Sequence, residues 1–208
     1  MAHQVGPKCR LCRREGMKLF LKGARCNSDK CAFLKKNYAP GATGQSFFKK
    51  TTEYGRQLRE KQKARRIFDV PEKQLSNYYS TASKSKGDTS TTLLTLLIMR
   101  LDSVIYRLGI VESPRQARQL ASHGHILLNG RRVDIPSIQL KPGDQLELRP
   151  HTKNSKLGTE LMKIKAKAPI WLKFDIKTMK GEVLDYPSEG DLQDLNINSR
   201  LIVEFYSR

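Results

Sequence analysis

Four cysteines lie within the first 31 residues of this 208-residue chain, and no other cysteine follows them. They form a C-x2-C-x13-C-x4-C pattern at Cys9, Cys12, Cys26 and Cys31. Two pairs of thiols separated by a loop are the ligands of a closed tetrahedral zinc site, which leaves no coordination position for a substrate. Clustered cysteines in a protein that is not secreted favour metal over disulfides. The pattern therefore predicts one structural Zn²⁺ ion, with an iron–sulfur cluster as the alternative for the same thiolate ligands.

A second group of chemically useful residues follows residue 113. Ser113 is a good N-cap and Pro114 suits the first position of a helix, so residues 114–122 are predicted to be helical. Arg115 and Arg118 are three residues apart and share the face opposite the apolar residues of that helix. Residues 126–133 then predict a hairpin with a type I′ turn at Asn129-Gly130.

The helix and the hairpin together present groups that bind phosphate. Arginine can donate two parallel hydrogen bonds to a phosphate, and no acidic residue occurs between residues 114 and 132. We therefore predict RNA contacts from this surface and from the two arginines of the preceding helix. These residues are Arg100, Arg107, Arg115, Arg118, His123, His125, Asn129, Arg131 and Arg132.

The charge of the whole chain points to the same class of partner. Its 39 Lys and Arg residues outnumber 20 Asp and Glu residues, and 18 of the basic but only 4 of the acidic residues precede residue 67. A positive net charge of this size is typical of a protein that binds a polyanion, which supplies the counter-charge. No apolar run approaches the roughly 20 residues of a membrane span, so nucleic acid is favoured over membrane. The predicted contacts here are Arg10, Arg13, Arg14, Lys18, Lys22, Lys35, Lys36, Lys49, Lys50, Arg56, Arg59, Lys63 and Arg66.

Secondary-structure elements must position these residues. Residues 1–50 are rich in glycine and are expected to be mainly loop. Apolar spacing and breakers predict helices at 54–68, 72–84, 94–108 and 155–167, and strands near 146–148, 169–174 and 201–205. No signal segment begins the chain, so a cytoplasmic protein is expected. The acidic residues after residue 181 are expected to face a basic neighbour.

Several motifs resemble one known family. The stretch RLDSVIYRLGIVESPRQARQLASHGHILLNG, residues 100–130, is similar to the S-four RNA-binding domain. GMKLFLKG at 16–23, YGRQLREKQKARRIF at 54–68 and LIVEFYSR at 201–208 resemble the S-four family of bacterial small-subunit ribosomal proteins. The resemblance implies an α+β fold, with a zinc-bearing N-terminal arm and helical domain plus an S-four RNA-binding domain on a small antiparallel β-sheet. The expected domains are an extended arm at 1–45, a helical domain at 46–92 and the S-four domain at 93–189, with the segment 190–208 packing back on the helical domain.

The family resemblance also implies a function. Members bind the five-prime domain of small-subunit rRNA early in assembly and lie beside ribosomal protein S-five and other small-subunit proteins. They line the channel through which mRNA enters, influence decoding accuracy, and act on the ribosome in the cytoplasm. No small-molecule substrate is implied.

Two sequence features raise alternative functions, namely an RNA-modifying enzyme and a DNA-binding zinc protein. Pseudouridine synthases carry an S-four domain and an Arg-Leu-Asp motif, which occurs here at residues 100–102. Only 59 residues follow Arg149, which is too few for their separate catalytic domain, so Asp102 is expected instead to orient a nearby arginine or to cap local backbone. A DNA-binding zinc protein would need a helix for the major groove, and the cysteine loop predicts none. The sequence therefore favours a structural RNA-binding protein that is not an enzyme.

Overall fold

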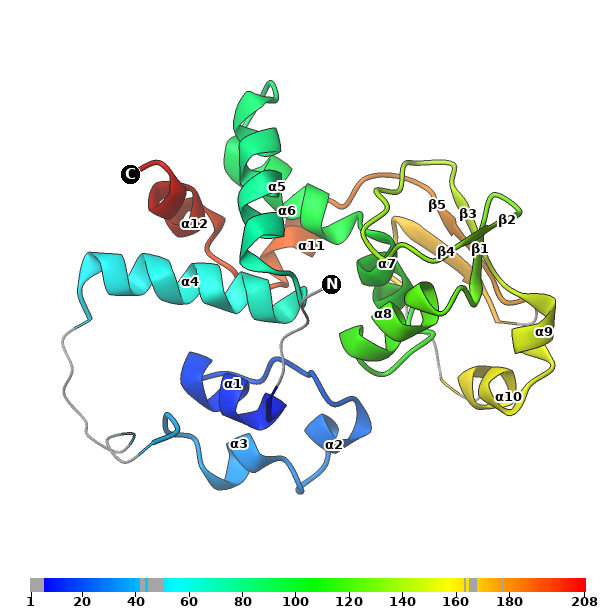
Figure 1. Cartoon of the computed structure of the whole chain (residues 1–208), viewed down its shortest axis with the longest axis horizontal. Coiled ribbons are helices and arrows are strands. Elements are labelled where there is room, and N and C mark those ends of the chain that lie inside the picture. The colour runs from blue at the N-terminus through cyan, green and yellow to red at the C-terminus, as the bar shows by residue number, and fades with distance from the viewer. Residues whose placement is uncertain (1–5, 42–43, 45–50, 163, 165–167, 177) are drawn as a thin grey trace. The chain divides into compact units, whose positions relative to one another are not determined.

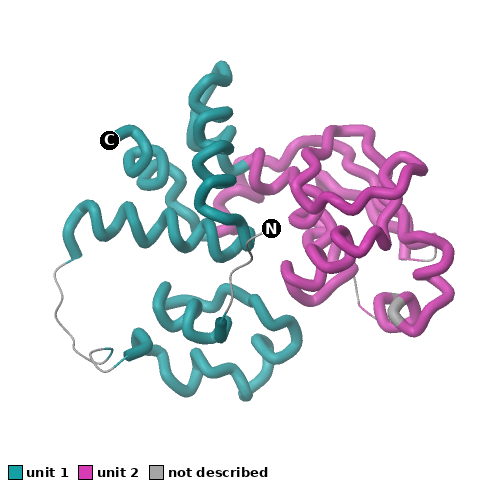
Figure 2. Tube along the Cα trace, viewed as in Figure 1, with its two compact units in different colours: residues 1–94, 196–208 teal, residues 95–195 magenta. Residues whose placement is uncertain are grey.

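The computed structural model describes the chain except for residues 1–5, 42–43, 45–50, 163, 165–167 and 177. The predicted RNA contacts Lys49 and Lys50 lie outside the described residues. The chain divides into two compact units, of which unit 1 comprises residues 1–94 and 196–208, and unit 2 comprises residues 95–195 (Figure 2). The arm and the helical segment therefore belong to one unit. No helix in the described part of the chain is long and apolar enough to cross a membrane.

The N-terminal segment of unit 1 is more ordered than its composition suggested. It forms three short helices, which are α1 (Lys8–Glu15), α2 (Ala24–Asn27) and α3 (Ala32–Lys35). Gly16 ends α1 in the left-handed conformation, with φ of 67°. Beyond that turn, Leu19 and Leu21 pack with Cys12 in a small core that also contacts Phe33. The segment was expected to be mainly loop, and these short helices were not anticipated, because a small local cluster of apolar residues supports them.

The two helices predicted after residue 50 are confirmed. The first is α4 (Glu53–Ile67), whose N-cap Thr52 accepts a hydrogen bond from the backbone N–H of Gly55 at 3.1 Å. The second is α5 (Glu72–Lys84), which begins directly after Pro71. Proline there fixes the backbone in an extended conformation that interrupts α4 but allows a new helix to start.

The C-terminal segment is a helix, and its prediction as a strand was wrong. α12 (Ser199–Tyr206) begins after Asn198, whose side chain caps it. α12 packs on α4 and α5, and Gln57 Nε2 donates a 3.0 Å hydrogen bond to Glu204 Oε2. The Tyr206 hydroxyl donates to Glu72 Oε1 at 2.8 Å. A short apolar run fits a strand and a buried helix equally well, and only this packing distinguishes them.

The single helix predicted at 94–108 is interrupted. The structure contains α6 (Thr89–Ile98) and α7 (Leu101–Arg107), with extended backbone at Arg100 between them. Arg100 forms an antiparallel bridge with Gln139, and Leu101 N–H donates to the Ile138 carbonyl at 2.8 Å. The apolar spacing continues through the break, so periodicity alone could not reveal it.

Unit 2 is built on an antiparallel sheet with the strand order β2-β1-β3-β5-β4 (Figure 1). The predicted helix α8 (Pro114–Ser122) and the predicted hairpin are confirmed, and Asn129 and Gly130 have the positive φ angles, 49° and 78°, of a type I′ turn. The strands are β1 (Ile126–Leu128), β2 (Arg131–Val133), β3 (Gln145–Leu148), β4 (Leu172–Asp175) and β5 (Lys180–Val183). Three short helices complete the unit, namely α9 (Pro150–Lys153), α10 (Lys156–Met162) and α11 (Glu189–Gln193).

Part of this arrangement was predicted and part was not. β3 confirms the strand near 146–148, β4 overlaps the strand expected at 169–174, and β5 was not anticipated. α10 covers the first part of the helix expected at 155–167, whose last residues lie partly outside the described ones. Leu108, the residue directly after α7, packs on the sheet where β5 has a glycine, since a Cβ at Gly181 would lie 2.9 Å from Leu108 Cδ1. The sheet and α7 thus form the core that supports α8.

Candidate nucleic-acid interface

A side-chain hydrogen bond caps the N-terminus of α8. Ser113 Oγ accepts a 3.3 Å hydrogen bond from the backbone N–H of Gln116, as expected of an N-cap. Ala117, Leu120 and Ala121 are buried, which leaves Arg115 exposed on the other face. The chain after α8 approaches the hairpin closely at Gly124. A Cβ on this residue would lie within 2.9 Å of Arg132 Nη2. The helix face and the hairpin therefore form one continuous surface.

Several arginines on this surface have uncompensated charge. Arg115, Arg131 and Arg132 are exposed, and no carboxylate in the described part of the chain forms an ion pair with them. An unpaired guanidinium at the surface is free to donate to phosphate without first breaking a contact within the protein. Their contact with RNA stays a prediction.

Arg100 does not belong to this surface, and its prediction as an RNA contact was wrong. The residue is fully buried, and its Nε and Nη2 donate to the two carboxylate oxygens of Asp102 at 2.9 and 2.7 Å. Asp102 is 5% exposed. The expectation that Asp102 orients a nearby arginine is confirmed. A carboxylate so enclosed cannot reach a nucleotide, so the structure does not favour Asp102 as the nucleophile of a modifying enzyme.

Arg118 and Arg107 are less accessible than Arg115. Arg118 Nη1 lies 3.5 Å from Asp102 Oδ2, and its side chain is 13% exposed. Arg107 donates to Ser103 Oγ at 3.1 Å, and burial lowers the pKa of Arg107 to about 10. Arg107 still carries a charge at neutral pH, and Arg118 is directed partly at the buried carboxylate of Asp102 inside unit 2.

Asn129 has a structural role in the hairpin turn. Its Nδ2 donates to Asp144 Oδ1 at 2.8 Å, while its Oδ1 accepts from the backbone N–H of Gln145 at the same distance. The side chain thereby fixes the hairpin to the start of β3. A contact of Asn129 with RNA stays a prediction.

The basic face predicted on α4 is paired with carboxylates. Arg56 pairs with Glu53, and Lys63 Nζ lies 2.9 Å from Glu60 Oε1. Glu15 on α1 pairs with the other two predicted contacts, Arg66 and, at 3.5 Å, Arg59. The local charge of this face is therefore smaller than the count of basic residues indicated, and its role in RNA binding stays a prediction.

Glu15 is nearly enclosed between α1 and α4. Its side chain is 2% exposed, and burial raises its pKa although Arg66 and Arg59 act in the opposite direction. Burial likewise lowers the pKa of Arg66. This buried pair fixes the cysteine-bearing segment to α4.

The basic residues of the N-terminal segment fall into two groups. Arg13 and Lys18 are engaged within the segment, because Arg13 Nε donates to the Tyr38 carbonyl at 2.9 Å and Lys18 Nζ donates to the Cys26 carbonyl at 3.5 Å. The other predicted contacts are exposed. They are Arg10, Arg14, Lys22, Lys35 and Lys36.

The four cysteines are free thiols that belong to three neighbouring helices. Cys9 and Cys12 lie on α1, Cys26 on α2, and Cys31 directly before α3; Cys9 is half-buried and the others are buried. Burial raises the pKa of Cys12, and the nearby thiols of Cys26, Cys9 and Cys31 raise it further. The backbone N–H of Lys22 donates to Cys26 Sγ at 3.4 Å.

The donor chemistry of these cysteines fits a zinc ion, but their arrangement is not that of a formed site. Four thiols that influence one another electrostatically are the right ligands, and backbone N–H groups directed at sulfur would stabilise thiolates. The described residues nevertheless include no group of three or more His, Cys, Asp or Glu side chains placed to hold a metal ion.

Two further basic residues near the interface were missed from the sequence. Arg149 Nη1 donates to the Gly124 carbonyl at 3.4 Å, and His151 follows at the start of α9. The signal was present as Arg149-Pro150-His151-Thr152-Lys153, a basic stretch directly after a predicted strand. This stretch lies beyond residue 130, where the motif that resembles the S-four domain ends.

Comparison with known proteins covers the entire chain. Residues 4–98 match the family described as Ribosomal protein S4/S9 N-terminal domain, and residues 99–146 match the S4 domain. Small ribosomal subunit protein uS4 of Thermus thermophilus is 49% identical over 211 residues, and the alignment covers 100% of both chains. The uS4 protein of Natranaerobius thermophilus is 49% identical over 210 residues, and protein uS4A of Clostridium novyi is 50% identical over 212 residues, each again with full coverage.

Proposed function

Because the chain belongs to the uS4 family of small ribosomal subunit proteins, we propose that it is a structural constituent of the small ribosomal subunit and binds rRNA there. It is not an enzyme, and it acts on the ribosome in the cytoplasm. The observation that carries the proposal is the identity of about half of all residues with uS4 proteins over their full length. Arg115, Arg131 and Arg132, which are exposed and form no ion pair with a carboxylate among the described residues, support it independently.

The mode of RNA binding follows from the chemistry of this surface. Arg115, Arg131 and Arg132 offer exposed charged donors on a helix and on a strand of the hairpin, which suits recognition of phosphates and RNA shape rather than base edges. Such contacts position a folded RNA without requiring a particular sequence. This is the behaviour expected of a protein that stabilises rRNA during assembly.

More specific roles rest on the family resemblance. The protein nucleates assembly of the five-prime domain of small-subunit rRNA, lines the path by which mRNA enters, and influences accuracy together with ribosomal protein S-five. The acidic residues after residue 181 support a basic protein neighbour, since Glu182, Asp185 and Glu189 belong to a stretch with few basic residues. Pseudouridine formation is not favoured, because Asp102 is enclosed by arginines.

Co-sedimentation tests the proposed function directly. The protein is expected to sediment with small ribosomal subunits and to remain bound through a wash at high salt, as an integral component does. A protein released completely at low ionic strength, or one found only with free enzymes of RNA modification, would contradict the proposal.

We also propose that Cys9, Cys12, Cys26 and Cys31 hold one structural zinc ion. Bound zinc would fix three short helices that share only a small core. Metal analysis of the purified protein should find about one zinc per chain, whereas iron with acid-labile sulfide would indicate a cluster. Chelation, or the variant with Cys9→Ser and Cys12→Ser, should lower the helix content of unit 1.

The fluorescence of Trp171 provides the control for the zinc experiment. This is the only tryptophan, and it is buried in unit 2. Its emission should not change on chelation if zinc supports only the N-terminal segment. Loss of the buried-tryptophan emission on chelation would contradict this division, and a metal-free protein with the same unit 1 structure would contradict the zinc proposal itself.

A further inference from the structure

Two guanidinium groups converge on one glycine at the end of α8. Arg132 from β2 lies so close to Gly124 that a Cβ there would meet Nη2 at 2.9 Å, and Arg149 Nη1 donates to the carbonyl oxygen of Gly124 at 3.4 Å. Gly124 has a φ of 66°, which permits the chain to turn between them. Within the described part of the chain no carboxylate forms an ion pair with either arginine. Like charges so placed repel each other unless an anion joins them.

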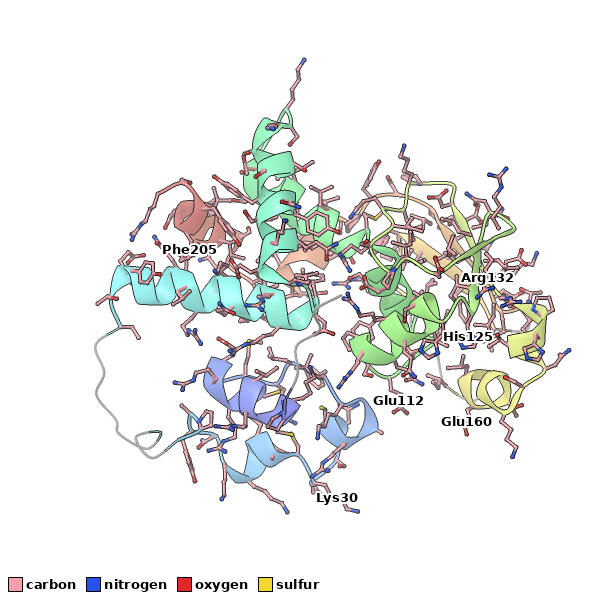
Figure 3. All side chains as sticks on the ribbon, in the orientation of Figure 1. Lys30, Glu112, His125, Arg132, Glu160 and Phe205 are labelled. Carbon is pink, nitrogen blue, oxygen red and sulfur yellow. The ribbon has the colours of Figure 1, made fainter. Side chains whose placement is uncertain are left out.

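Three histidines lie near these two arginines. The rings of His123 and His125 are 6.0 Å apart, and His151 follows on α9. Figure 3 shows His125 and Arg132 on the same side of unit 2, beside α9. Burial lowers the pKa of His125, and His123, Arg149, His151 and Arg132 lower it further. All four of these neighbours are basic, so nothing among them offsets a proton on His125.

The hydrogen bond of the His125 ring is compatible with both the neutral and the protonated imidazole. His125 Nδ1 lies 2.9 Å from Thr152 Oγ1, and Thr152 is 2% exposed. A hydroxyl group can donate to a neutral imidazole nitrogen or accept from a protonated one. The ring can therefore gain a proton without losing this hydrogen bond, and Nε2 is not engaged by it.

We propose that Arg132, Arg149, His125 and His151 form a subsite for a backbone phosphate of rRNA, and that binding there is accompanied by uptake of a proton. The subsite rests on the proposed function and extends the interface past residue 146, where the matched S4 domain ends. A phosphate satisfies the converging guanidinium groups and supplies the negative charge that the cluster lacks. It also stabilises the imidazolium form of His125, so affinity rises as the pH falls.

Binding of purified bacterial small-subunit rRNA to the full chain tests the subsite. The variant with Arg149→Gln and His151→Gln should bind roughly three- to tenfold more weakly at constant salt, as expected for the loss of charged hydrogen bonds. Its plot of log affinity against log salt should be shallower by roughly one unit, which corresponds to one phosphate contact. Lys173→Gln is the matched control, because Lys173 is an exposed cation on β4 at the opposite edge of the sheet. Its affinity should match that of the unmodified protein.

The proton uptake has a separate measurement. Affinity of the unmodified protein should increase between pH 8 and pH 5.5, and the increase should be smaller for His125→Gln, whose amide can still bond to Thr152. Circular dichroism confirms that each variant is folded. Unchanged affinity and salt dependence of the variant with Arg149→Gln and His151→Gln would overturn the subsite, and an unchanged pH dependence of His125→Gln would overturn the proton uptake. If the unmodified protein does not bind rRNA at all, the proposed function is overturned together with the subsite. If it binds and the variants bind equally well, only the subsite is overturned.

Discussion

At the scale of residues, the arginines of this protein divide into those that form buried ion pairs within the fold and those that are exposed to a binding partner. Arg100 and Arg66 lie in buried pairs with Asp102 and Glu15, whereas Arg115 and Arg131 are exposed without a carboxylate partner in the described residues. The two classes have the same side-chain chemistry and occur in similar sequence contexts. Burial decides the difference, because a buried arginine must be paired to offset its loss of hydration.

The pair between Arg100 and Asp102 gives the first prediction. Asp102→Asn leaves the Arg100 guanidinium buried without a counter-charge, which should lower the free energy of unfolding by about 3 to 5 kcal/mol. Urea unfolding followed by the fluorescence of Trp171 measures this in unit 2.

Two comparisons accompany the Asp102 variant. Asp134→Asn removes an exposed carboxylate from the same unit and should change stability by at most about 0.5 kcal/mol. The combined change Arg100→Met and Asp102→Leu should restore much of the loss, because neither charge is then buried alone. Equal stability of Asp102→Asn and Asp134→Asn would contradict the structural role of the pair.

Glu15 gives a prediction about pH. Burial raises its pKa in the folded protein above the value in the unfolded chain. Its contribution to stability is therefore fully present below the unfolded pKa, near 4.5, and is lost as the pH rises through the folded pKa. Denaturant unfolding followed by circular dichroism should show that the unmodified protein exceeds Glu15→Gln in stability by more at pH 4.5 than at pH 7.5. A difference that grows with pH would contradict this assignment.

At the scale of elements, helix α12 completes the helical part of unit 1. Phe205 lies against α4 (Figure 3), with its ring 5.7 Å from that of Tyr54 and 4.4 Å from the ammonium group of Lys61. Lys61 is also paired with Glu72 of α5 at 2.6 Å. One buried ammonium group thus joins α4 and α5, which are consecutive in the sequence, to α12, which is far from both.

Ile202 tests the packing of α12. It is fully buried, so Ile202→Ala should lower the free energy of unfolding by about 2 to 4 kcal/mol through lost contacts and a cavity. Val203→Ala is the matched control on the same helix, because Val203 is only half-buried and should cost less. Thermal unfolding followed by circular dichroism compares them, and a larger effect of Val203→Ala would show that α12 packs through another face.

At the scale of the whole molecule, the net charge predicts the class of partner but does not predict which surface binds it. The formal charge of +19 requires a polyanion, yet the cations of α4 that contribute to it are paired with carboxylates. The hairpin and α8 have fewer basic residues, but more of them lack an ion pair with any carboxylate that the structure describes. Free cations, rather than total cations, should therefore set the salt dependence of rRNA binding.

A pair of variants tests this distinction. Arg115→Ala with Arg131→Ala should weaken rRNA binding and reduce the salt slope by roughly one to two units, since each phosphate contact contributes about 0.9. Arg56→Ala removes a charge that Glu53 already offsets and should reduce the slope less. Filter binding at several salt concentrations measures both. A larger change for Arg56→Ala would place the main contact on α4 instead of α8.

Local features of the sequence were enough to predict the class of partner, the helices α4, α5 and α8, and the type I′ hairpin. These depend on charge, on local apolar spacing and on capping or turn residues, all of which act over a few positions. The tertiary structure decided that 201–205 is helical, that the chain breaks at Arg100, and which arginines are free. Those outcomes depend on partners distant in the sequence, namely α4 for α12, Gln139 for Arg100 and Glu15 for Arg66. Local pattern cannot reveal them, because the free energy that selects them comes from contacts that exist only in the folded chain.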